Sequence, residues 1–512
     1  MKRALISVYK KNKELLDFSF FLKKKKYEII STGGTYEFLK KNGLYPINIS
    51  DVTSFSEILD GRIKSIHPNI YAGILANRSI NKHLESIKNN NIKLIDIVLI
   101  NFYPFNEKKS NKSIKMKSLL EFIDIGGPSL IRAAAKNFHY VTPIIDSNDY
   151  ESVKKEINYN GFTSLILRQK LAGKAFNFTS NYDYIISKYF LKLKVEKFPK
   201  KINLFYEKKM NLPYGENPHQ KASFYVDNIN KKGSMYNFSQ IHGKKISFNN
   251  IRDIDIAWKI VNQFYKPTCC IIKHSTPCGV ACGNNNVEAF KKAYSADHIS
   301  SFGGIAAFNT KISYELAIKI NNLFLEVIIG PSYDDDSLSI LKSKKNLRII
   351  SINNPISNKM DYVQVDGGLL VQESDYSNKN DNYKIVTKRN FSNQEIKSIF
   401  FAQKVVKFVK SNAIVVASGM QTVGISGGQT NRIWAARQAI SRALELKKNK
   451  KKLVLVSDAF FPFKDIIDEV ANSKLIYAIL QPGGSIRDSE SINACNNYGI
   501  AMAFTGKRYF KH

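Results

Sequence analysis

Residues Leu94–Ile100 read LIDIVLI, an almost unbroken run of apolar side chains. A run of this kind is typical of a parallel β-strand that helices cover on both faces. Upstream, Ala4–Val8 and Tyr27–Ile30 are two more short apolar segments, and Glu14–Leu22 between them has helical spacing. Short strands that alternate with helices predict a doubly wound α/β domain in the first part of the chain.

The chain is long enough for more than one such domain. Its 512 residues exceed what a single ordinary core holds, and the composition changes before the middle. Residues 191–211 are basic, contain a proline and lack clear periodicity, whereas strand-like runs such as CCIIK and KLVLVS follow further on. We therefore expect two α/β domains, residues 1–192 and 212–512, joined by a linker at residues 193–211.

The chain is strongly basic, with 77 Lys and Arg against 43 Asp and Glu and a formal net charge of +34. A nucleic-acid-binding protein is one interpretation of this excess, and it requires the cations to gather in one stripe with aromatic residues between them. Here the lysines are spread through the whole sequence, which favours a bias of composition. We expect no specific nucleic-acid partner, although a positive field would attract anionic small substrates.

Other features of the composition concern the compartment. No apolar run approaches the roughly 20 residues that a membrane-spanning helix needs, and the first apolar stretch, which ends at Val8, is too short for a signal peptide. The five cysteines are odd in number and mostly clustered, so they imply no disulfide framework. We expect a cytoplasmic protein without a membrane partner.

Small, hydroxyl and basic residues follow the predicted strands of the first domain. They form three clusters, Ser7–Lys11, Ser31–Thr35 and Arg62–Ser65, and the second cluster contains a glycine pair at a helix start. Free backbone N–H groups at such a start can hold a phosphate. The clusters fit either a phosphate site or ordinary turns with solvated surface groups.

A carboxylate, a phenol and an ammonium group are candidates for proton transfer in the same domain. Asp124 precedes Gly126–Gly127 and a helix that carries Lys136, and Tyr103 follows the most buried strand. Such groups near free amides can move protons and stabilise an oxyanion. A capping aspartate and a packed tyrosine are the alternative, which the residues alone favour.

In the second domain, Lys273 and His274 end an apolar run and form a candidate acid/base pair, with a structural histidine as the alternative. A zinc deaminase would show H-x-E and then P-C-x-x-C. Here Cys282 lies one residue too far from Cys278, and no H-x-E precedes them. We therefore predict no metal site. Gly-rich turns beside arginines further on suit phosphate or carboxylate groups.

A longer set of motifs runs in one order along nearly the whole chain: STGGT, DGRIKSIHP, NFYPF, IDIGGPSLIRAAAKN, YGENPHQ, IKHSTPCGVA, SFGGIAAF, DGGLLVQ, KFVKSNAIV, SDAFFPFKD, QPGGSIRD and RYFKH. Together they resemble the family of bifunctional purine-biosynthesis enzymes that combine an AICAR transformylase with an IMP cyclohydrolase. Here AICAR is aminoimidazole carboxamide ribotide, FAICAR its formylated form and IMP inosine monophosphate.

For the first domain, the resemblance implies a methylglyoxal-synthase-like doubly wound fold that closes FAICAR into IMP with loss of water. The cyclisation residues that carry over are Lys64, Tyr103, Asp124 and Lys136. The substrate contacts that carry over are Ser7, Lys11, Thr32, Gly34, Thr35, Arg62, Ser65, Gly126 and Gly127.

For the second domain, the resemblance implies two cytidine-deaminase-like subdomains without zinc. They would transfer formyl from the co-substrate 10-formyltetrahydrofolate to the 5-amino group of AICAR. His274 would take the amine proton, Lys273 would assist transfer to the folate, and Asn412 would hold the formyl oxygen. The ligand contacts that carry over are Tyr214, Phe302, Gly303, Arg432, Phe461, Asp465 and Arg508. A homodimer is also implied, with this site at its interface.

The sequence departs from the family pattern at three places. Pro213 stands where the family has an arginine that contacts the ribotide phosphate, and losing one charge-assisted contact costs about 1.5–3 kcal/mol. Tyr9 and Lys10 replace a small residue and an acid, and the run GISGGQTNR differs from GIGAGQ-x-SR. The competing hypotheses are an enzyme with only one working domain, a basic nucleic-acid-binding protein and a zinc deaminase.

Overall fold

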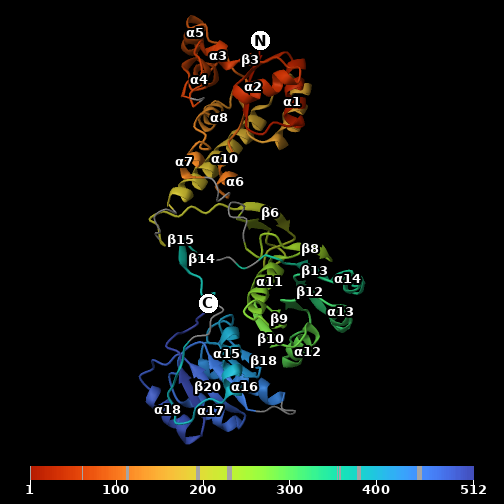
Figure 1. Cartoon of the computed structure of the whole chain (residues 1–512), viewed down its shortest axis with the longest axis vertical. Helices are drawn as coiled ribbons and strands as arrows, with labels where there is room; N and C mark the ends of the chain where they lie inside the picture. Colours follow the sequence, from red (N-terminus) through yellow and green to blue (C-terminus); the bar gives the residue numbers. More distant parts are fainter. Residues whose placement is uncertain are drawn as a thin grey trace. The chain divides into compact units, whose positions relative to one another are not determined.

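The computed structural model describes residues 2–59, 62–110, 115–191, 197–227, 233–354, 356, 359–376, 382–446 and 452–512. The chain forms two compact units, Met1–Phe205 and Tyr206–His512, drawn in red to yellow and in green to blue in Figure 1. The predicted linker at 193–211 contains this division, although its residues 193–196 lie outside the described part. Its last residues, from Glu207, form strand β6 of the second unit.

A parallel sheet of five strands forms the centre of the first unit, in the order β3-β2-β1-β4-β5. In sequence order the strands are β1 (Lys2–Val8), β2 (Tyr27–Ser31), β3 (Ile47–Asn48), β4 (Ile97–Asn101) and β5 (Thr142–Ile144). All four neighbouring pairs are parallel. The LIDIVLI run supplies β4, and residues 97–100 of that strand are buried. The predicted doubly wound α/β fold is confirmed.

The helices of the first unit are α1 (Lys13–Lys24), α2 (Gly33–Lys41), α3 (Ile49–Thr53), α4 (Pro68–Leu75), α5 (Asn81–Asn89), α6 (Phe105–Ser110), α7 (Met116–Leu120), α8 (Gly126–Lys136), η2 (Ser147–Asp149), α9 (Tyr150–Asn160) and α10 (Leu165–Leu191). The strand order changes direction at β1, because β2 lies on one side of it and β4 on the other. In open α/β sheets, ligands bind outside the carboxyl ends of the strands at this switch point.

The second unit contains a sheet of twelve strands in the order β16-β21-β20-β19-β17-β18-β10-β9-β11-β12-β13-β8. These strands are β8 (Ser239–His242), β9 (Thr268–Lys273), β10 (Thr276–Cys282), β11 (Gly304–Phe308), β12 (Leu325–Gly330), β13 (Arg348–Ser351), β16 (Lys384–Ile385), β17 (Ile414–Ser418), β18 (Gln421–Ser426), β19 (Leu453–Ser457), β20 (Ile476–Gln481) and β21 (Ala501–Phe504). Two separate hairpins are β6 (Glu207–Leu212) with β7 (Ala222–Val226), and β14 (Met360–Val365) with β15 (Gly368–Glu373).

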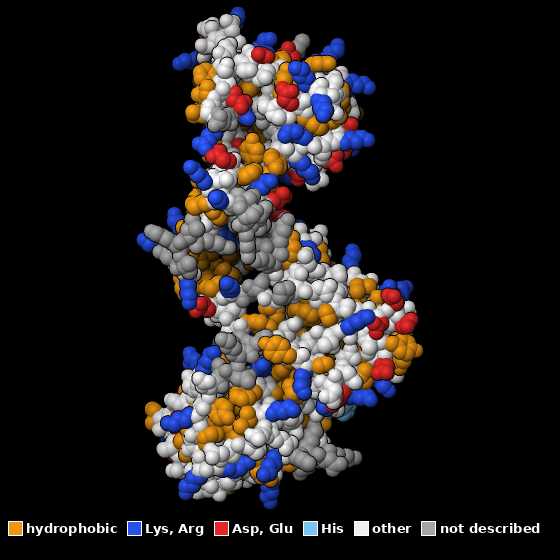
Figure 2. All heavy atoms as spheres, in the orientation of Figure 1, with side chains coloured by type: hydrophobic (Ala, Val, Ile, Leu, Met, Phe, Trp, Pro, Cys, Tyr) orange, Lys and Arg blue, Asp and Glu red, His pale blue; other side chains and the backbone are white. Residues whose placement is uncertain are grey.

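The helices of the second unit are α11 (Phe248–Val261), α12 (Asn286–Ala296), α13 (Tyr314–Asn321), α14 (Asp335–Lys342), α15 (Asn393–Val406), α16 (Arg432–Glu445), α17 (Asp465–Ser473) and α18 (Asp488–Asn497). In the part of the chain that the structure describes, no helix combines the length and apolarity that crossing a bilayer requires. On the face drawn in Figure 2, Lys and Arg side chains are scattered among acidic and apolar ones and do not form one stripe.

The two halves of the twelve-stranded sheet repeat one topology. From the centre outward, β10-β9-β11-β12-β13-β8 has the same strand directions as β18-β17-β19-β20-β21-β16. Each half also has a helix before its central hairpin, α11 or α15, and a helix after that hairpin, α12 or α16. The resemblance implied two subdomains here, although the sequence itself shows no repeat of fixed period.

One detail of packing recurs in both halves. A Cβ atom added to Gly279 in β10 would lie 2.0 Å from the carbonyl oxygen of Ala293 in α12. A Cβ atom added to Gly424 in β18 would lie 2.0 Å from the carbonyl oxygen of Ala439 in α16. At each position only glycine lets the helix approach the sheet so closely.

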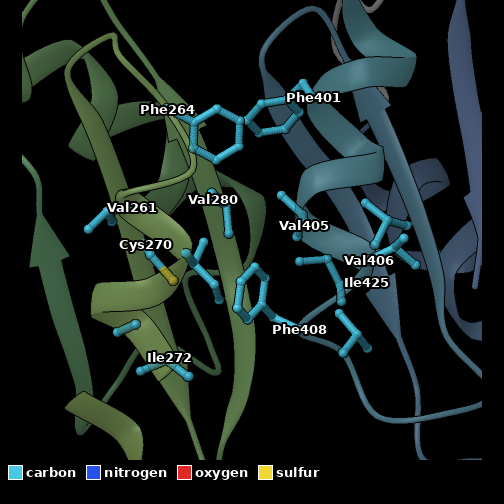
Figure 3. Packing of buried hydrophobic residues seen from close by; sticks show 14 of the residues in the cluster. Val261, Phe264, Cys270, Ile272, Val280, Phe401, Val405, Val406, Phe408 and Ile425 are labelled. Carbon is cyan, nitrogen blue, oxygen red and sulfur yellow. The ribbon is translucent and has the colours of Figure 1, made fainter. Parts of the chain in front are cut away.

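The halves join through antiparallel pairing of β10 with β18 and through one shared core. In Figure 3, side chains of the first half such as Phe264 and Val280 point toward Phe401 and Val405 of the second. The rings of Phe264 and Phe401 have centroids 5.2 Å apart. Because these buried residues belong to one cluster, the two halves form a single body.

Candidate active sites

Hydroxyl groups join the ends of two strands at the switch point of the first unit. The Oγ atom of Ser7, in β1, lies 2.8 Å from Oγ1 of Thr32, the residue that precedes α2. Oγ1 of Thr35 accepts a hydrogen bond from the Val8 N–H and donates one to the Val8 carbonyl, both at 3.0 Å. These contacts fix the start of α2 against the carboxyl end of β1.

Two lysines lie beside the glycine pair at the start of α2. A Cβ atom on Gly33 would lie 3.2 Å from Nζ of Lys64, and one on Gly34 would lie 3.4 Å from Nζ of Lys11. Burial lowers the pKa of Lys11, and the charge of Lys64 lowers it further. Two cations that face free backbone N–H groups at a helix start form an anion site.

A small pocket of about 150 Å³ adjoins this anion site. Its lining residues are Gly33, Tyr36, Glu37, Asn48, Ile49, Ser50, Phe55, Glu57 and Lys64. Only Lys64 and the glycine turn were among the sequence expectations for this place. The other lining residues come from segments whose composition carried no chemical signal.

Asp124 lies at the start of α8, where its Oδ1 atom accepts a hydrogen bond of 2.8 Å from the Gly127 N–H. Burial raises the pKa of this carboxyl, while the Gly127 N–H and the charge of Lys64 oppose the rise. The pKa of Tyr103 is raised by burial and by the charge of Asp124. A Cβ atom on Gly126 would lie 3.0 Å from Oγ of Ser65. The carboxylate, phenol and lysine predicted for cyclisation therefore lie in one electrostatic neighbourhood.

One residue predicted for this site lies far from Asp124, and another is held in an ion pair. Lys136 ends α8, whereas Asp124 precedes its first residue. At 1.5 Å per residue, the length of α8 separates them by roughly 16 Å. The Arg62 side chain forms an ion pair with Glu121, and both side chains are exposed.

In the second unit, the registers of the strands bring distant segments to one edge of the sheet. Lys273 pairs with Thr276 across the turn that joins β9 to β10. Asn412 precedes β17, and β17 and β10 both pair antiparallel with β18, which lies between them. Asn412 and the His274 turn therefore lie at the same edge, two strands apart, a spacing of about 10 Å.

The other residues predicted for formyl transfer reach this edge as well. β11 starts and β18, β19 and β21 end there, as their pairing partners require. These strand ends carry Phe302 and Gly303, Arg432, Phe461 and Asp465, and Arg508. The same edge holds the starts of β12 and β13 and the end of β8.

Direct contacts connect the catalytic candidates with the loop before β11. Nζ of Lys273 donates a hydrogen bond of 2.9 Å to the carbonyl oxygen of Phe302. The Gly303 N–H donates one of 2.8 Å to the carbonyl oxygen of Phe324, and the rings of Phe302 and Phe324 have centroids 4.9 Å apart. The Phe302 ring remains 65% exposed, so it is available to a planar ligand.

A cavity of about 850 Å³ continues from Phe324 to Tyr214. Its lining residues are Pro213, Tyr214, Lys244, Lys245, Ser247, Asn322, Leu323, Phe324, Leu325, Glu326, Lys344, Lys345, Asn346, Leu347 and Arg348. Lys344 donates to the Leu323 carbonyl, and Arg348 lies 3.7 Å from its Glu326 partner. These two cations are therefore already bound within the protein.

Three further lysines of the cavity, Lys244, Lys245 and Lys345, are exposed. Within the described ranges, no hydrogen bond or ion pair involves their ammonium groups. The sequence analysis missed them, because single lysines in so basic a chain give no signal. The cavity therefore presents uncommitted positive charge beside the Tyr214 phenol.

Arg432 and Phe461, in the second half of the sheet, were expected to contact a ligand. Their side chains are instead buried in the protein. Arg432 is 6% exposed and pairs with the fully buried carboxylate of Asp458, while it also donates to Oγ of Ser457 at 3.0 Å. Phe461 is 0% exposed and belongs to a core cluster. A buried ion pair and an apolar core therefore hold these two side chains, and any effect of theirs on a ligand is indirect.

The remaining residues predicted for this half are more accessible. Nδ2 of Asn412 donates a hydrogen bond of 2.8 Å to the carbonyl oxygen of Gln429. Asp465 starts α17, and burial raises the pKa of its carboxyl. The guanidinium of the exposed Arg508 lies 4.8 Å from the centre of the Phe510 ring.

Among the described residues, no group of three or more His, Cys, Asp or Glu side chains is arranged to hold a metal ion. Burial raises the pKa of Cys278 to about 12 and that of Cys282 to about 11. Thiols that bind a metal lose their protons, so these environments oppose that role.

Two α/β units, each with titratable groups gathered at one edge of its sheet, define an enzyme with two active sites. The family model for "AICARFT/IMPCHase bienzyme" matches residues 134–442, and that for "MGS-like domain" matches residues 14–129. A protein of Fusobacterium nucleatum subsp. nucleatum, named bifunctional purine biosynthesis protein PurH, is 51% identical over 511 residues and 100% of both chains. A protein of the same name from Clostridium beijerinckii is 49% identical over the same extent. The chain therefore belongs to the AICARFT/IMPCHase bienzyme family.

Proposed function

We propose that this chain performs the last two steps of IMP synthesis. It transfers the formyl group of 10-formyltetrahydrofolate to AICAR and then closes the resulting FAICAR to IMP with release of water. The observation that carries this proposal is the meeting of Lys273, His274 and Asn412 at one sheet edge in a unit separate from Asp124 and Lys64. We assign cyclisation to residues 1–192 and formyl transfer to 212–512, with 193–211 as linker.

In formyl transfer, the 5-amino group of AICAR attacks the formyl carbon. That amine is a poor nucleophile because its lone pair is delocalised, so removal of its proton must accompany attack. His274 takes this proton, Lys273 supports its delivery to the folate nitrogen, and the Asn412 amide stabilises the formyl oxygen. The hydrogen bond from Lys273 to Phe302 and the exposed Phe302 ring support binding of a planar substrate there.

In cyclisation, the carboxamide nitrogen of FAICAR attacks the formyl carbon and an oxyanion forms. The start of α8 supplies backbone N–H groups, and Lys64 supplies a positive charge for this oxygen. Asp124 accepts the proton of the attacking nitrogen, and Tyr103 protonates the oxyanion to a hydroxyl group. Loss of the formamide N–H proton, with transfer of a second proton to that hydroxyl, forms the ring C=N bond and releases water. The raised pKa of Asp124 supports this role, because a carboxylate with a higher pKa is a stronger base.

Both substrates carry a ribotide phosphate, and each site has cations for it. In the first unit, Lys11 and Lys64 flank the glycine turn of α2. In the second, we assign the phosphate to the cavity beside Tyr214, where Lys244 and Lys245 contribute charge that Pro213 cannot supply. Asp465 serves the folate, supported by its partial burial and its place at the same sheet edge.

We further propose a homodimer that works in the cytoplasm. The separation of Asp124 from Lys136 at opposite ends of α8 supports this proposal, since two chains can supply these residues to one site. The hairpin β14–β15 exposes Tyr362, Val363 and Leu370, an apolar surface suited to a partner. The free cysteines agree with a reducing compartment.

The test follows both half-reactions with the purified full-length chain. AICAR and 10-formyltetrahydrofolate should yield tetrahydrofolate and IMP, and added FAICAR should yield IMP without folate. Lys273→Ala should abolish only the first reaction and Asp124→Asn only the second. Failure of the unsubstituted chain to consume folate would refute the formyl transfer, and failure to close FAICAR would refute the cyclisation.

A further inference from the structure

The turn that carries His274 has an uncommon backbone conformation. It joins β9 to β10 with two residues, and His274 and Ser275 have φ of +53° and +61°. Two successive positive φ angles define a type I′ turn, which favours Gly, Asn and Asp. Positive φ is uncommon for residues other than glycine, and two such residues in succession need another contact to stabilise the turn.

That contact comes from Asp253, which lies in α11 and is 9% exposed. Its Oδ1 atom accepts a hydrogen bond of 2.7 Å from the Ser275 N–H and one of 3.2 Å from the Ser275 hydroxyl. Both hydrogen bonds act on the residue that directly follows His274. The carboxylate therefore fixes the backbone from which the imidazole projects.

The second half of the sheet offers a natural comparison. Its corresponding turn joins β17 to β18 through Gly419 and Met420, and Gly419 has a φ of +58°. The Gly419 N–H donates a hydrogen bond of 2.8 Å to Oγ of Ser398. Ser398 and Asp253 are each the sixth residue of their helices. The turn with glycine in the left-handed conformation is therefore held by a neutral hydroxyl, whereas the His274–Ser275 turn is held by a carboxylate.

The two turns lie at opposite edges of the sheet, because β10 and β18 are antiparallel. Only the turn of the first half lies at the edge that carries Asn412 and Phe302. We propose that Asp253 is a positioning residue for formyl transfer, which holds the His274–Ser275 turn so that His274 faces the substrate amine. This inference rests on the proposed function of that site.

Loss of the Asp253 contacts affects His274 more than Lys273. The Lys273 ammonium is held separately by the Phe302 carbonyl, whereas the His274 backbone depends on the turn. A misplacement of about 1 Å in a catalytic group costs roughly 100-fold in rate. Binding of AICAR at the lysine-lined cavity should change little. The expected signature is therefore a fall in kcat with an almost constant KM.

The experiment compares Asp253→Asn, Asp253→Leu and Ser398→Ala in the full-length chain. Asparagine keeps an oxygen that accepts from Ser275, so kcat for formyl transfer should stay within about threefold. Leucine removes the acceptor, and kcat should fall about 100-fold while the KM for AICAR stays within about threefold. Ser398→Ala, the matched control, should leave both reactions unchanged. Closure of FAICAR, measured on each variant, reports on the first unit.

A second pair of variants covers the case in which Asp253→Leu does not fold. Asp253→Ala should lose activity, and adding Ser275→Gly should restore kcat at least about tenfold, because glycine adopts positive φ without strain. The inference is overturned if Asp253→Leu keeps kcat, if the loss appears in KM, or if Asp253→Asn is as inactive as Asp253→Leu. Absence of formyl transfer in the unsubstituted chain would instead refute the proposed function.

Discussion

Oδ1 of Asp124 accepts a hydrogen bond from the Gly127 N–H at 2.8 Å, and burial raises the pKa of the same carboxyl. The group thus caps α8 while its charged form is disfavoured by its surroundings. Stability and catalysis therefore make opposite demands on it. A raised pKa means that the folded state holds the proton more tightly than the unfolded state.

We expect Asp124→Asn to separate these demands. The stabilising contribution of a group with a raised pKa is present below its unfolded pKa and is lost as pH rises through the folded value. The amide keeps the cap without that loss, so its melting temperature at pH 7 should equal or exceed that of the parent. FAICAR closure should fall by about 10²–10⁴-fold. Calorimetry at pH 4 and 7 with rate assays would check both, and a destabilised, active variant would contradict the assignment.

The lowered pKa of Lys11 predicts a pH-dependent affinity for phosphate-bearing ligands in the first unit. Burial and the charge of Lys64 favour the neutral amine, and a bound anion favours the ammonium. IMP binding should therefore take up protons. As the pH rises, the affinity for IMP should begin to fall at a lower pH than it would if Lys11 had the pKa of an ordinary lysine.

Calorimetric titration with IMP between pH 7 and 10, in two buffers of different ionisation enthalpy, measures both the affinity and the number of protons taken up. Lys11→Met should abolish the pH dependence, whereas Lys13→Met, at an exposed lysine of α1, should keep it. An unchanged proton uptake in Lys11→Met would assign the effect to another group.

The cavity beside Tyr214 predicts a separable contribution of its lysines to AICAR binding. Lys245→Ala should raise the KM for AICAR about fivefold, the effect of ~1 kcal/mol for an exposed charge contact. Lys244→Ala should act similarly, and the double substitution should multiply the two effects. Lys342→Ala, an exposed lysine of α14 outside the cavity lining, is the control. Equal KM values in all variants would place the phosphate elsewhere.

The separation of Asp124 from Lys136 along α8 predicts complementation between inactive chains. Asp124→Asn and Lys136→Ala should each lack FAICAR closure. If one site draws these residues from two chains, equimolar mixing with subunit exchange should restore about a quarter of the parental activity. No recovery, with exchange verified by tagged chains, would show that both residues serve within one chain or that Lys136 is not needed.

The parallel sheet of the first unit could be predicted from sequence because its signals are local. The apolar run of β4 and the glycine pair at the start of α2 depend on nearby residues alone. The duplicated sheet of the second unit was expected only from the family resemblance, since its halves share strand order and helix placement without a fixed sequence period. Topology of this kind is set by long-range pairing, such as that of β10 with β18.

The site residues divide in the same way. Strand ends pointed to Lys273 and His274, because a polar pair after an apolar run is visible in the sequence. Phe461 was assigned to a ligand only through the resemblance, and its burial depends on packing that the sequence does not show. The pairing of Arg432 with Asp458 joins residues far apart in the sequence and gave no signal. Asp253 gave no signal, since its role depends on the backbone angles of a turn 22 residues away.

The duplicated sheet also constrains which parts of the second unit can change over evolutionary time. Its two repeats present their equivalent turns at opposite edges, and only one turn carries Lys273 and His274. The other, with Gly419, is free to vary without loss of chemistry, yet its repeat cannot be discarded. Each repeat contributes buried residues to the common core, where Phe264 packs against Phe401. Deletion of either repeat would therefore expose the apolar surface of the other. The shared core therefore makes the two repeats mutually dependent, although only one of them carries Lys273 and His274.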